Sequence, residues 1–342
     1  MINKLCIKKI KKEQNIHEVI IMKMNDNVNF RTDLAYEDTI RIKKDNDIFV
    51  NSHRKLFDID VHMTKVSDYL SKEINKKPGT YYTINLGQLD ICDHLDNNKI
   101  IEVLKMVLLE LIDKYHLKNK KAMIVGLGNI HVTPDSLGPY VLDNVIVTRH
   151  LFKLDSINPG YSEVSALSPG VMGNTGIETF DIIKSVVSNV DVDYIIVVDA
   201  LASSSISRVN KTIQVTDAGI NPGSGVGNSR KELSKDTLGI PTFAIGVPTV
   251  VDAATITSDI IDCMCEYFEK QVKDEELDTT RHFLGEVGVL DSNEKKSLMY
   301  EILADNGYNM MVTPKEVDAD IEALAKIIAA SIDLALHQAL GE

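Results

Sequence analysis

Short apolar runs alternate with amphipathic stretches through the middle of the chain. Runs rich in β-branched residues occur at residues 122–126, 193–202, 212–217 and 241–249. An uninterrupted apolar run such as residues 122–126 is typical of a strand that is buried on both faces, as in a parallel sheet. Residues 178–190 lie between the first two runs and have apolar positions at helical spacing. This order of strands and helices predicts an α/β sheet.

The chain before the first run carries extended and helical patterns in turn. Residues 24–36 are polar and are expected to form an exposed arm. Alternating apolar and polar positions between residues 40 and 90 predict strands, and residues 99–114 have the apolar spacing of a helix. We therefore expect a β-rich part before the sheet, with one helix leading into the first strand.

Beyond the first run the patterns are more varied. Residues 145–150 are β-branched and predict a further strand, whereas residues 155–179 contain so many turn residues that an ordered but irregular loop is expected. From residue 259 onward the pattern is mostly helical, with a charged break at residues 274–281. Residues 321–339 are rich in Ala, Leu and Ile and predict a closing helix with an apolar face.

Two aspartates follow two of the predicted parallel strands. Gly126-Leu-Gly128 ends the first strand and leads into a polar loop that carries Asp135, and Asp199 lies at the end of the second strand. The carboxyl ends of parallel strands meet at one edge of a sheet, where the sites of α/β proteins form. Two neighbouring carboxylates share a proton, so one activates water while the other protonates a leaving group. Acids at strand ends also cap helices or bind loop amides, and spacing alone leaves both interpretations open.

Three further motifs have a chemical and a structural interpretation. Gly126-Leu-Gly128 is similar to the start of a dinucleotide fingerprint, but His131 stands where the third glycine belongs. The loop Gly223-Ser224-Gly225-Val-Gly227 could cradle phosphate through its amides, yet no Gly-Lys-Ser/Thr follows, and tight turns are the alternative. Arg149 and His150 could polarise a substrate carbonyl or form a structural hydrogen-bonding pair.

Composition argues against several classes of partner. The 342 residues are 44% hydrophobic, enough to bury a sizeable core, and 50 acidic against 37 basic residues give a net charge of -13. This charge argues against nucleic-acid binding and against anionic membranes. The cysteines are scattered and no metal-ligand motif is present, so we expect reduced thiols, no metal and no cofactor. The apolar segment near the N-terminus is far shorter than the roughly 20 residues of a membrane span, so we expect a cytoplasmic protein.

Several motifs together resemble the germination proteases of spore-forming bacteria. The resemblance runs from Arg31 to the final helix. The motifs are Gly126-Leu-Gly-Asn129, Val132-Thr-Pro-Asp135-Ser-Leu-Gly-Pro139, Val147-Thr-Arg-His150, Ser165-Ala-Leu-Ser-Pro-Gly-Val-Met-Gly173, Val198-Asp-Ala-Leu-Ala202, Gly223-Ser-Gly-Val-Gly-Asn228 and Gly246-Val-Pro-Thr-Val-Val-Asp252. The chain departs from the family pattern at two places. The pattern has an arginine where this chain has Ser203-Ser-Ser205, and a threonine where this chain has Ala218.

The resemblance implies an endopeptidase that degrades small acid-soluble spore proteins during germination. Such an enzyme is made as an inactive zymogen and assembles as a homotetramer in the cytoplasm of the spore core. The implied fold is a three-layer α/β sandwich around a mostly parallel sheet, similar to the hydrogenase maturation peptidases, in one domain over residues 34–342. An atypical aspartic mechanism is implied, with Asp135 and Asp199 as the catalytic pair. The residues expected in the loops around this pair are Asn129, Arg149, His150, Gly223, Ser224 and Gly225.

The resemblance also implies a cleavage site within the chain itself. Substrates of the family are cut after an acidic residue that is followed by an apolar residue and alanine, the order in which Asp33, Leu34 and Ala35 stand. We therefore expect autoprocessing at the Asp33–Leu34 bond, promoted by mild acid, with residues 1–33 as the propeptide. A terminus without a role is the alternative for these residues.

Two other functions stay open at this point. A metal-dependent maturation-type peptidase would need Glu, Asp and His ligands around the loops that carry the two aspartates. A non-enzymatic nucleotide-binding module would use the glycine loops instead.

Overall fold

The structure, a computed structural model, describes Leu34 and residues 50–74, 76–223, 230–271, 287, 290–308 and 310–340. The chain divides into two compact units. The larger unit comprises residues 31–203, 207–250 and 313–342, and the smaller unit includes residues 204–206 and 251–312. The single domain expected over residues 34–342 stays a prediction.

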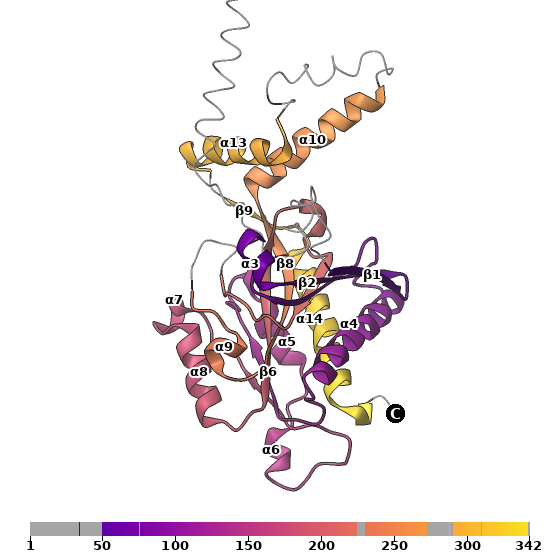
Figure 1. The fold of residues 1–342 in the computed structure, drawn as a ribbon, viewed down its shortest axis with the longest axis vertical. Coiled ribbons are helices and arrows are strands. Elements are labelled where there is room, and N and C mark those ends of the chain that lie inside the picture. Colours follow the sequence, from indigo (N-terminus) through magenta and orange to yellow (C-terminus); the bar gives the residue numbers. More distant parts are fainter. Residues whose placement is uncertain are drawn as a thin grey trace, which may run out of the picture. The chain divides into compact units, whose positions relative to one another are not determined.

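The larger unit is built on a mixed sheet (Figure 1). Its strands lie in the order β1 (Val50–Leu56), β2 (Ile59–Val66), β3 (Gly79–Asn85), β7 (Thr212–Thr216), β8 (Thr242–Asp252), β6 (Tyr194–Ser203), β4 (Ala122–Gly126) and β5 (Val164–Leu167). β4 runs parallel to β5 and β6, and β8 begins beside β6, where Ile195 N donates to Pro241 O at 3.0 Å. The strands from β1 to β8 in this order pair antiparallel. All four strands predicted from the apolar runs are confirmed, although β7 runs antiparallel to its neighbours.

Helices cover both faces of this sheet (Figure 1). α4 (His94–Lys114), α5 (Leu137–Asn144) and α14 (Val317–Leu336) pack on one face, and α8 (Thr179–Asn189) and α9 (Lys235–Leu238) on the other. Successive residues of β4 divide between the two cores, since Ile124 belongs to the first and Val125 to the second. A strand that is buried on both faces has no polar side, which explains its uninterrupted apolar run. The larger unit is therefore a three-layer α/β sandwich, as predicted.

The predicted helices are confirmed, with shifted ends. α4 begins before its apolar pattern does, because the Asp93 side chain accepts the N–H groups of Leu95 and Asp96 and caps the first turn. The remaining short elements are α3 (Asp68–Ile74), η1 (Thr133–Asp135), α6 (Arg149–Phe152), α7 (Met172–Thr175), η2 (Ile206–Arg208) and η5 (Gln338–Leu340).

The strand predicted over residues 145–150 is wrong, since this stretch connects α5 to α6 and contains the first two residues of α6. Ile146 N donates to Oδ1 of Asp333 at 3.0 Å, and Thr148 N donates to Val164 O at 3.0 Å. Burial raises the pKa of Asp333 to about 6. β-branched residues favour an extended backbone both in a strand and in a connecting segment. The tertiary contacts of Ile146 and Thr148 therefore determine that this stretch is a connection and not a strand.

Two expected irregular segments also differ from the prediction. The loop over residues 155–179 contains β5 and α7, each four residues long. In the arm expected over residues 24–36, Leu34 is the one residue that the structure describes, and its side chain is 0% exposed. The prediction of an exposed arm is therefore wrong at Leu34, and the rest of that stretch lies outside the described residues.

The described part of the smaller unit is mostly helical. α10 (Ala253–Gln271) packs against α13 (Ser292–Asp305), and β9 (Met311–Val312) pairs antiparallel with the last two residues of β8. The ammonium group of Lys296 donates to Ser204 O at 2.7 Å. These helices confirm the pattern predicted beyond residue 259, while the charged break at residues 274–281 lies outside the described part. Among the helices described in either unit, none has the length and apolar character of a membrane span.

Candidate active site

Asp135 lies at the end of η1, in the connection from β4 to α5. Its carboxylate Oδ2 accepts the N–H of Asn129 at 2.9 Å, and its main-chain oxygen accepts the same N–H at 3.0 Å. The hydroxyl of Thr249, on β8, donates to Pro134 O at 2.6 Å. These hydrogen bonds hold Asp135 to Asn129, near the start of the same loop, and hold the loop to the strand β8.

Glycines allow this loop to lie directly on the strand ends. Gly128 has a φ of +113°, and a Cβ there would lie 1.9 Å from Asp135 O. A Cβ on Gly138, at the start of α5, would lie 2.3 Å from Leu127 O and 2.7 Å from Val198 O. No side chain fits at either position without moving the backbone. In this part of the chain, the Gly126-Leu-Gly128 pattern thus serves close packing between strand, loop and helix.

Asp199 lies in β6 at the point where β4 leaves the sheet. The last register pair joins Gly126 to Val198, and Leu127 N still donates to Val198 O at 2.8 Å. Asp199 is the next residue of β6 and is 5% exposed, and its Oδ1 accepts the N–H of Ala200 at 2.9 Å. Because β6 continues past it, Asp199 lies inside a strand rather than beyond its end.

Both aspartates therefore lie at the carboxyl edge of the parallel strands. Asp199 follows Val198, whose carbonyl accepts the N–H of Leu127. Gly128, the residue after Leu127, packs directly against Asp135. The topology brings the two predicted acids to the same edge of the sheet, as expected for parallel neighbours.

Burial raises the pKa of Asp135 above its ordinary value. Two weaker effects oppose the shift, since the N–H of Asn129 binds the carboxylate and the positive charge of Arg230 favours its ionised form. Asp135 consequently keeps a proton at higher pH than an exposed aspartate does. Carboxyl groups perturbed in this way are common at catalytic sites.

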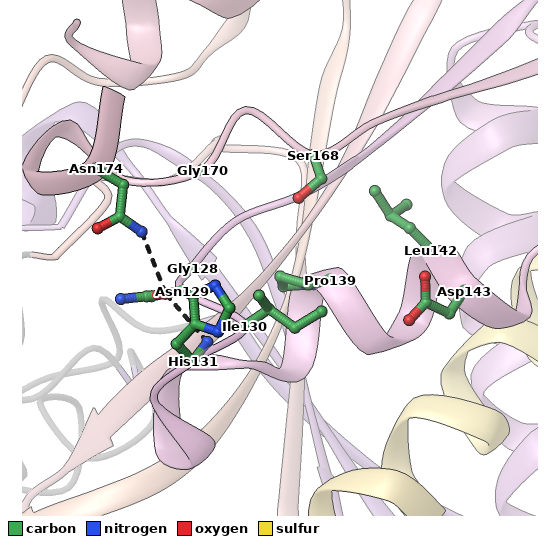
Figure 2. A pocket seen from close by; sticks show the side chains of 10 residues that line it. All are labelled: Gly128, Asn129, Ile130, His131, Pro139, Leu142, Asp143, Ser168, Gly170 and Asn174. Atoms are coloured by element: carbon green, nitrogen blue, oxygen red, sulfur yellow. Dashed lines mark hydrogen bonds between the residues drawn. The ribbon is translucent and has the colours of Figure 1, made fainter. Parts of the chain in front are cut away.

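A cavity of about 210 Å³ opens beside the Asp135 loop (Figure 2). One wall is formed by the segment after β4 together with α5, and the other by the segment after β5 together with α7. Nδ2 of Asn174 donates to Oδ1 of Asn129 at 3.5 Å and joins the two walls, as Figure 2 shows. Neither Asp135 nor Asp199 lines this cavity. Asn129 connects it to Asp135, because the N–H of Asn129 binds the carboxylate and Asn129 also lines the cavity.

Arg149 and His150 lie at the opposite edge of the sheet. Nη1 of Arg149 donates to the carboxylate of Glu163 at 2.7 Å and to Asp191 O at 2.8 Å, residues that precede β5 and β6. The five residues of β4, about 16 Å at roughly 3.3 Å per residue, separate this edge from the Asp135 loop. His150 is exposed. The structure thus places both residues away from the two aspartates, and a structural role fits Arg149.

Other predicted site residues are described only in part. Gly223 has a φ of +70°, whereas Ser224 and Gly225 lie outside the described residues, as does Asp33 of the expected processing site. The departures from the family pattern fall on positions that are largely buried, with Ser203 1% and Ala218 7% exposed.

Two residues near Asp135 were missed from the sequence. Thr249 is 115 positions from Pro134 in the chain, and its role depends on β8 lying next to the loop. Arg230 follows the glycine loop as the first of two basic residues, Arg230 and Lys231, a signal that could have directed attention to it.

The larger unit is an α/β sandwich with two acids at the carboxyl edge of its parallel strands. Many α/β proteins form their functional sites at this edge. The family model for germination proteases matches residues 30–281 and 275–342 of the chain. The chain belongs to the germination protease family, which makes it a peptidase and confirms the resemblance seen in its motifs.

Individual relatives match over most of their length. The germination protease of Bacillus licheniformis is 44% identical over 338 residues, which cover 91% of this chain and 92% of that relative. The germination protease of a Geobacillus species is 43% identical over 318 residues, covering 84% and 86% of the two chains. Among solved structures, the NiFe hydrogenase maturation protease HycI from Thermococcus kodakarensis matches with 19% identity and a TM-score of 0.26, covering 42% of this chain and 80% of that one.

In the part of the chain that is described, no group of three His, Cys, Asp or Glu side chains is arranged to hold a metal ion. Activity without a metal or cofactor stays a prediction.

Proposed function

We propose that the chain is an endopeptidase in which Asp135 and Asp199 act as a catalytic pair. The observation that carries this proposal is the register of β4 and β6, which puts both acids at one edge of the sheet. Asp135, with its raised pKa, is suited to be the acid that protonates the leaving amine. Asn129 N–H holds Oδ2, so a proton on Oδ1 does not compete with that bond. Asp199 then serves as the base that activates water.

Separate Asp135→Asn and Asp199→Asn substitutions test this pair. Each replaces a carboxylate by an amide of nearly equal volume, so we expect a folded protein whose turnover falls by at least about 100-fold, the lower range for loss of general acid–base catalysis. Asp113→Asn, at an exposed position of α4, is the matched control and should leave turnover unchanged. Near-normal turnover in either site variant would reject the pair.

Small acid-soluble spore proteins are the proposed substrates, and degradation during germination is the proposed role. The support comes from the family and from the names of the relatives, all germination proteases. The proposed location is accordingly the cytoplasm of the spore core. Incubation of the purified protein with a small acid-soluble spore protein, followed by mass spectrometry of the new termini, tests the substrate. An uncut spore protein under conditions where another unfolded protein is digested would contradict it.

We further propose that the chain is a zymogen that cuts its own Asp33–Leu34 bond. The buried Leu34 side chain supports this, because it would hold the new N-terminus in place after the cut. Mild acid of about pH 5, roughly one unit above the ordinary pKa of aspartate, should promote the cut by reducing repulsion between Asp33 and the catalytic acids. N-terminal sequencing after incubation should find Leu34. A different new terminus would disprove this site, and Asp199→Asn should block the cut if it is autocatalytic.

The proposed assembly is a homotetramer. Within the smaller unit, α10 exposes three large apolar side chains at helical spacing, Ile260 at 55%, Met264 at 39% and Tyr267 at 62%. Such a stripe favours association, because covering apolar surface is favourable in water. Sedimentation equilibrium checks the assembly, and a monomer at all concentrations would exclude it.

A further inference from the structure

The cavity beside the Asp135 loop is smaller than the pockets that bind drug-sized ligands. Its volume is about 210 Å³, whereas pockets for drug-sized ligands begin at about 300 Å³. A space of this size suits one large side chain of a longer molecule. A peptide bound along the carboxyl edge of β4 would supply such a side chain.

The chemistry of the cavity favours an apolar occupant. Ile130, Pro139 and Leu142 supply apolar surface, and Ile130 remains 47% exposed in the loop after β4. An exposed isoleucine in a concave site gains free energy when an apolar group covers it. Asp143, which also lines the cavity, disfavours an acidic side chain there by like-charge repulsion.

Polar groups of the cavity match the main chain of an extended peptide. The Oδ1 atom of Asn129 accepts the N–H of His131 at 3.1 Å and the side-chain amide of Asn174 at 3.5 Å. The second N–H of that Asn174 amide, together with the Ser168 hydroxyl, offers hydrogen bonds to peptide groups passing the cavity. Figure 2 shows Asn174 and Ser168 on one wall and Asn129 on the other.

The cavity is close enough to Asp135 to act on the same substrate. Asn129 belongs to the cavity wall and donates its N–H to the Asp135 carboxylate, and a Cβ on Gly128, also in the wall, would lie 3.3 Å from Asp135 Cγ. Successive residues of an extended peptide are about 3.3 Å apart. A side chain seated in the cavity therefore belongs to a residue close to the bond that Asp135 would act on.

We infer that this cavity is a specificity subsite that takes one large apolar side chain of the peptide substrate. The inference rests on the proposed peptidase function of Asp135 and Asp199. It adds that apolar selectivity at one substrate position comes from Ile130 and its neighbours in the cavity wall.

Ile130→Ala tests the subsite, with Val132→Ala as the matched control. Both residues are 47% exposed in the same loop, and only Ile130 lines the cavity. The full-length protein and each variant are incubated with a peptide library prepared from unfolded proteins, and the residues flanking every cut bond are read by mass spectrometry. In Ile130→Ala, we expect kcat/KM to fall about 10-fold or more for peptides with Leu or Phe at one position near the cut, and much less for peptides with Ala there.

The outcomes separate the subsite from the proposed catalysis. A cleavage profile in Ile130→Ala equal to that of Val132→Ala, while Asp135→Asn abolishes cleavage, overturns the subsite and leaves the catalytic pair intact. A change in sedimentation without a change in profile assigns the cavity to a subunit contact and also overturns the subsite. Cleavage that survives both Asp135→Asn and Asp199→Asn removes the proposed catalysis, and the subsite inference falls with it.

Discussion

Substitution of Thr249 tests whether the Asp135 loop is positioned from β8. Thr249 is 1% exposed, and its hydroxyl donates to Pro134 O, the carbonyl directly before Asp135, at 2.6 Å. Thr249→Val removes this donor and keeps the branched shape. Its main-chain oxygen, which accepts the Thr313 hydroxyl at 2.9 Å, is unchanged by the substitution. The change thus affects one hydrogen bond to the loop without opening a cavity.

The expected effect follows from what the Pro134 carbonyl loses. A neutral hydrogen bond contributes about 1 kcal/mol net, and a buried acceptor left unpaired costs about 1–3 kcal/mol. Pro134 is half-buried, so water can replace part of the lost hydrogen bonding to its carbonyl. We therefore expect the free energy of unfolding to fall by about 1–2 kcal/mol. Displacement of a catalytic group by about 1 Å lowers turnover on the order of 100-fold, which sets the scale for the loss in kcat/KM.

The assay combines guanidinium unfolding, followed by circular dichroism, with the rate of cleavage of a small acid-soluble spore protein. Thr249→Ser is the control, because it keeps the hydroxyl and loses only a methyl group. We expect the serine variant to keep most of its activity and the valine variant to lose most of it. Equal activity in the valine variant and the unmodified protein would refute the reasoning, and so would a serine variant as impaired as the valine variant.

Three further predictions concern other parts of the chain. Gly128→Ala should reduce turnover at least as far as Thr249→Val does, because its Cβ would lie 1.9 Å from Asp135 O; the cleavage assay measures this. Because the pKa of Asp333 is raised to about 6, its ionised form destabilises the fold above that pH. This destabilisation disappears as the pH falls toward 3.8, because between these values the folded protein binds a proton that the unfolded chain does not bind. Asp333→Asn should therefore increase the free energy of unfolding by about 3 kcal/mol near pH 7 and by little near pH 4, which urea unfolding at both pH values checks. Ile260→Glu combined with Met264→Glu should weaken self-association without unfolding the subunit, since both side chains are exposed on α10; sedimentation at several concentrations checks this.

The elements that could be predicted are those whose own burial determines their residues. β4 and β6 are buried on both faces, so their apolar runs were sufficient to identify them. β5 was missed because its four residues lie at the sheet edge with alternating burial and turn-rich flanks. The false strand at residues 145–150 consists of residues with the right local preference whose partners, such as Asp333, are remote in sequence.

The candidate site shows the same division between local and remote information. Asp135 and Asp199 could be found from their positions relative to two strands. Thr249 could not be found, because its function exists only after β8 lies beside the loop. Arg149 looked equally suitable in the sequence, but parallel strands have two edges, and it lies at the amino one.

The contact between Gly126 and Gly138 has a consequence for how the protein can evolve. A Cβ on Gly126 would lie 2.3 Å from Gly138 O and 2.9 Å from Cγ of Leu142, so α5 packs directly on the main chain of β4 at this glycine. Apolar side chains elsewhere in the core can then be exchanged among related sequences without shifting the helix that follows Asp135. Ile130 lies outside this contact and is 47% exposed. A substitution at Ile130 can therefore alter the proposed subsite without moving the main-chain contact that precedes Asp135.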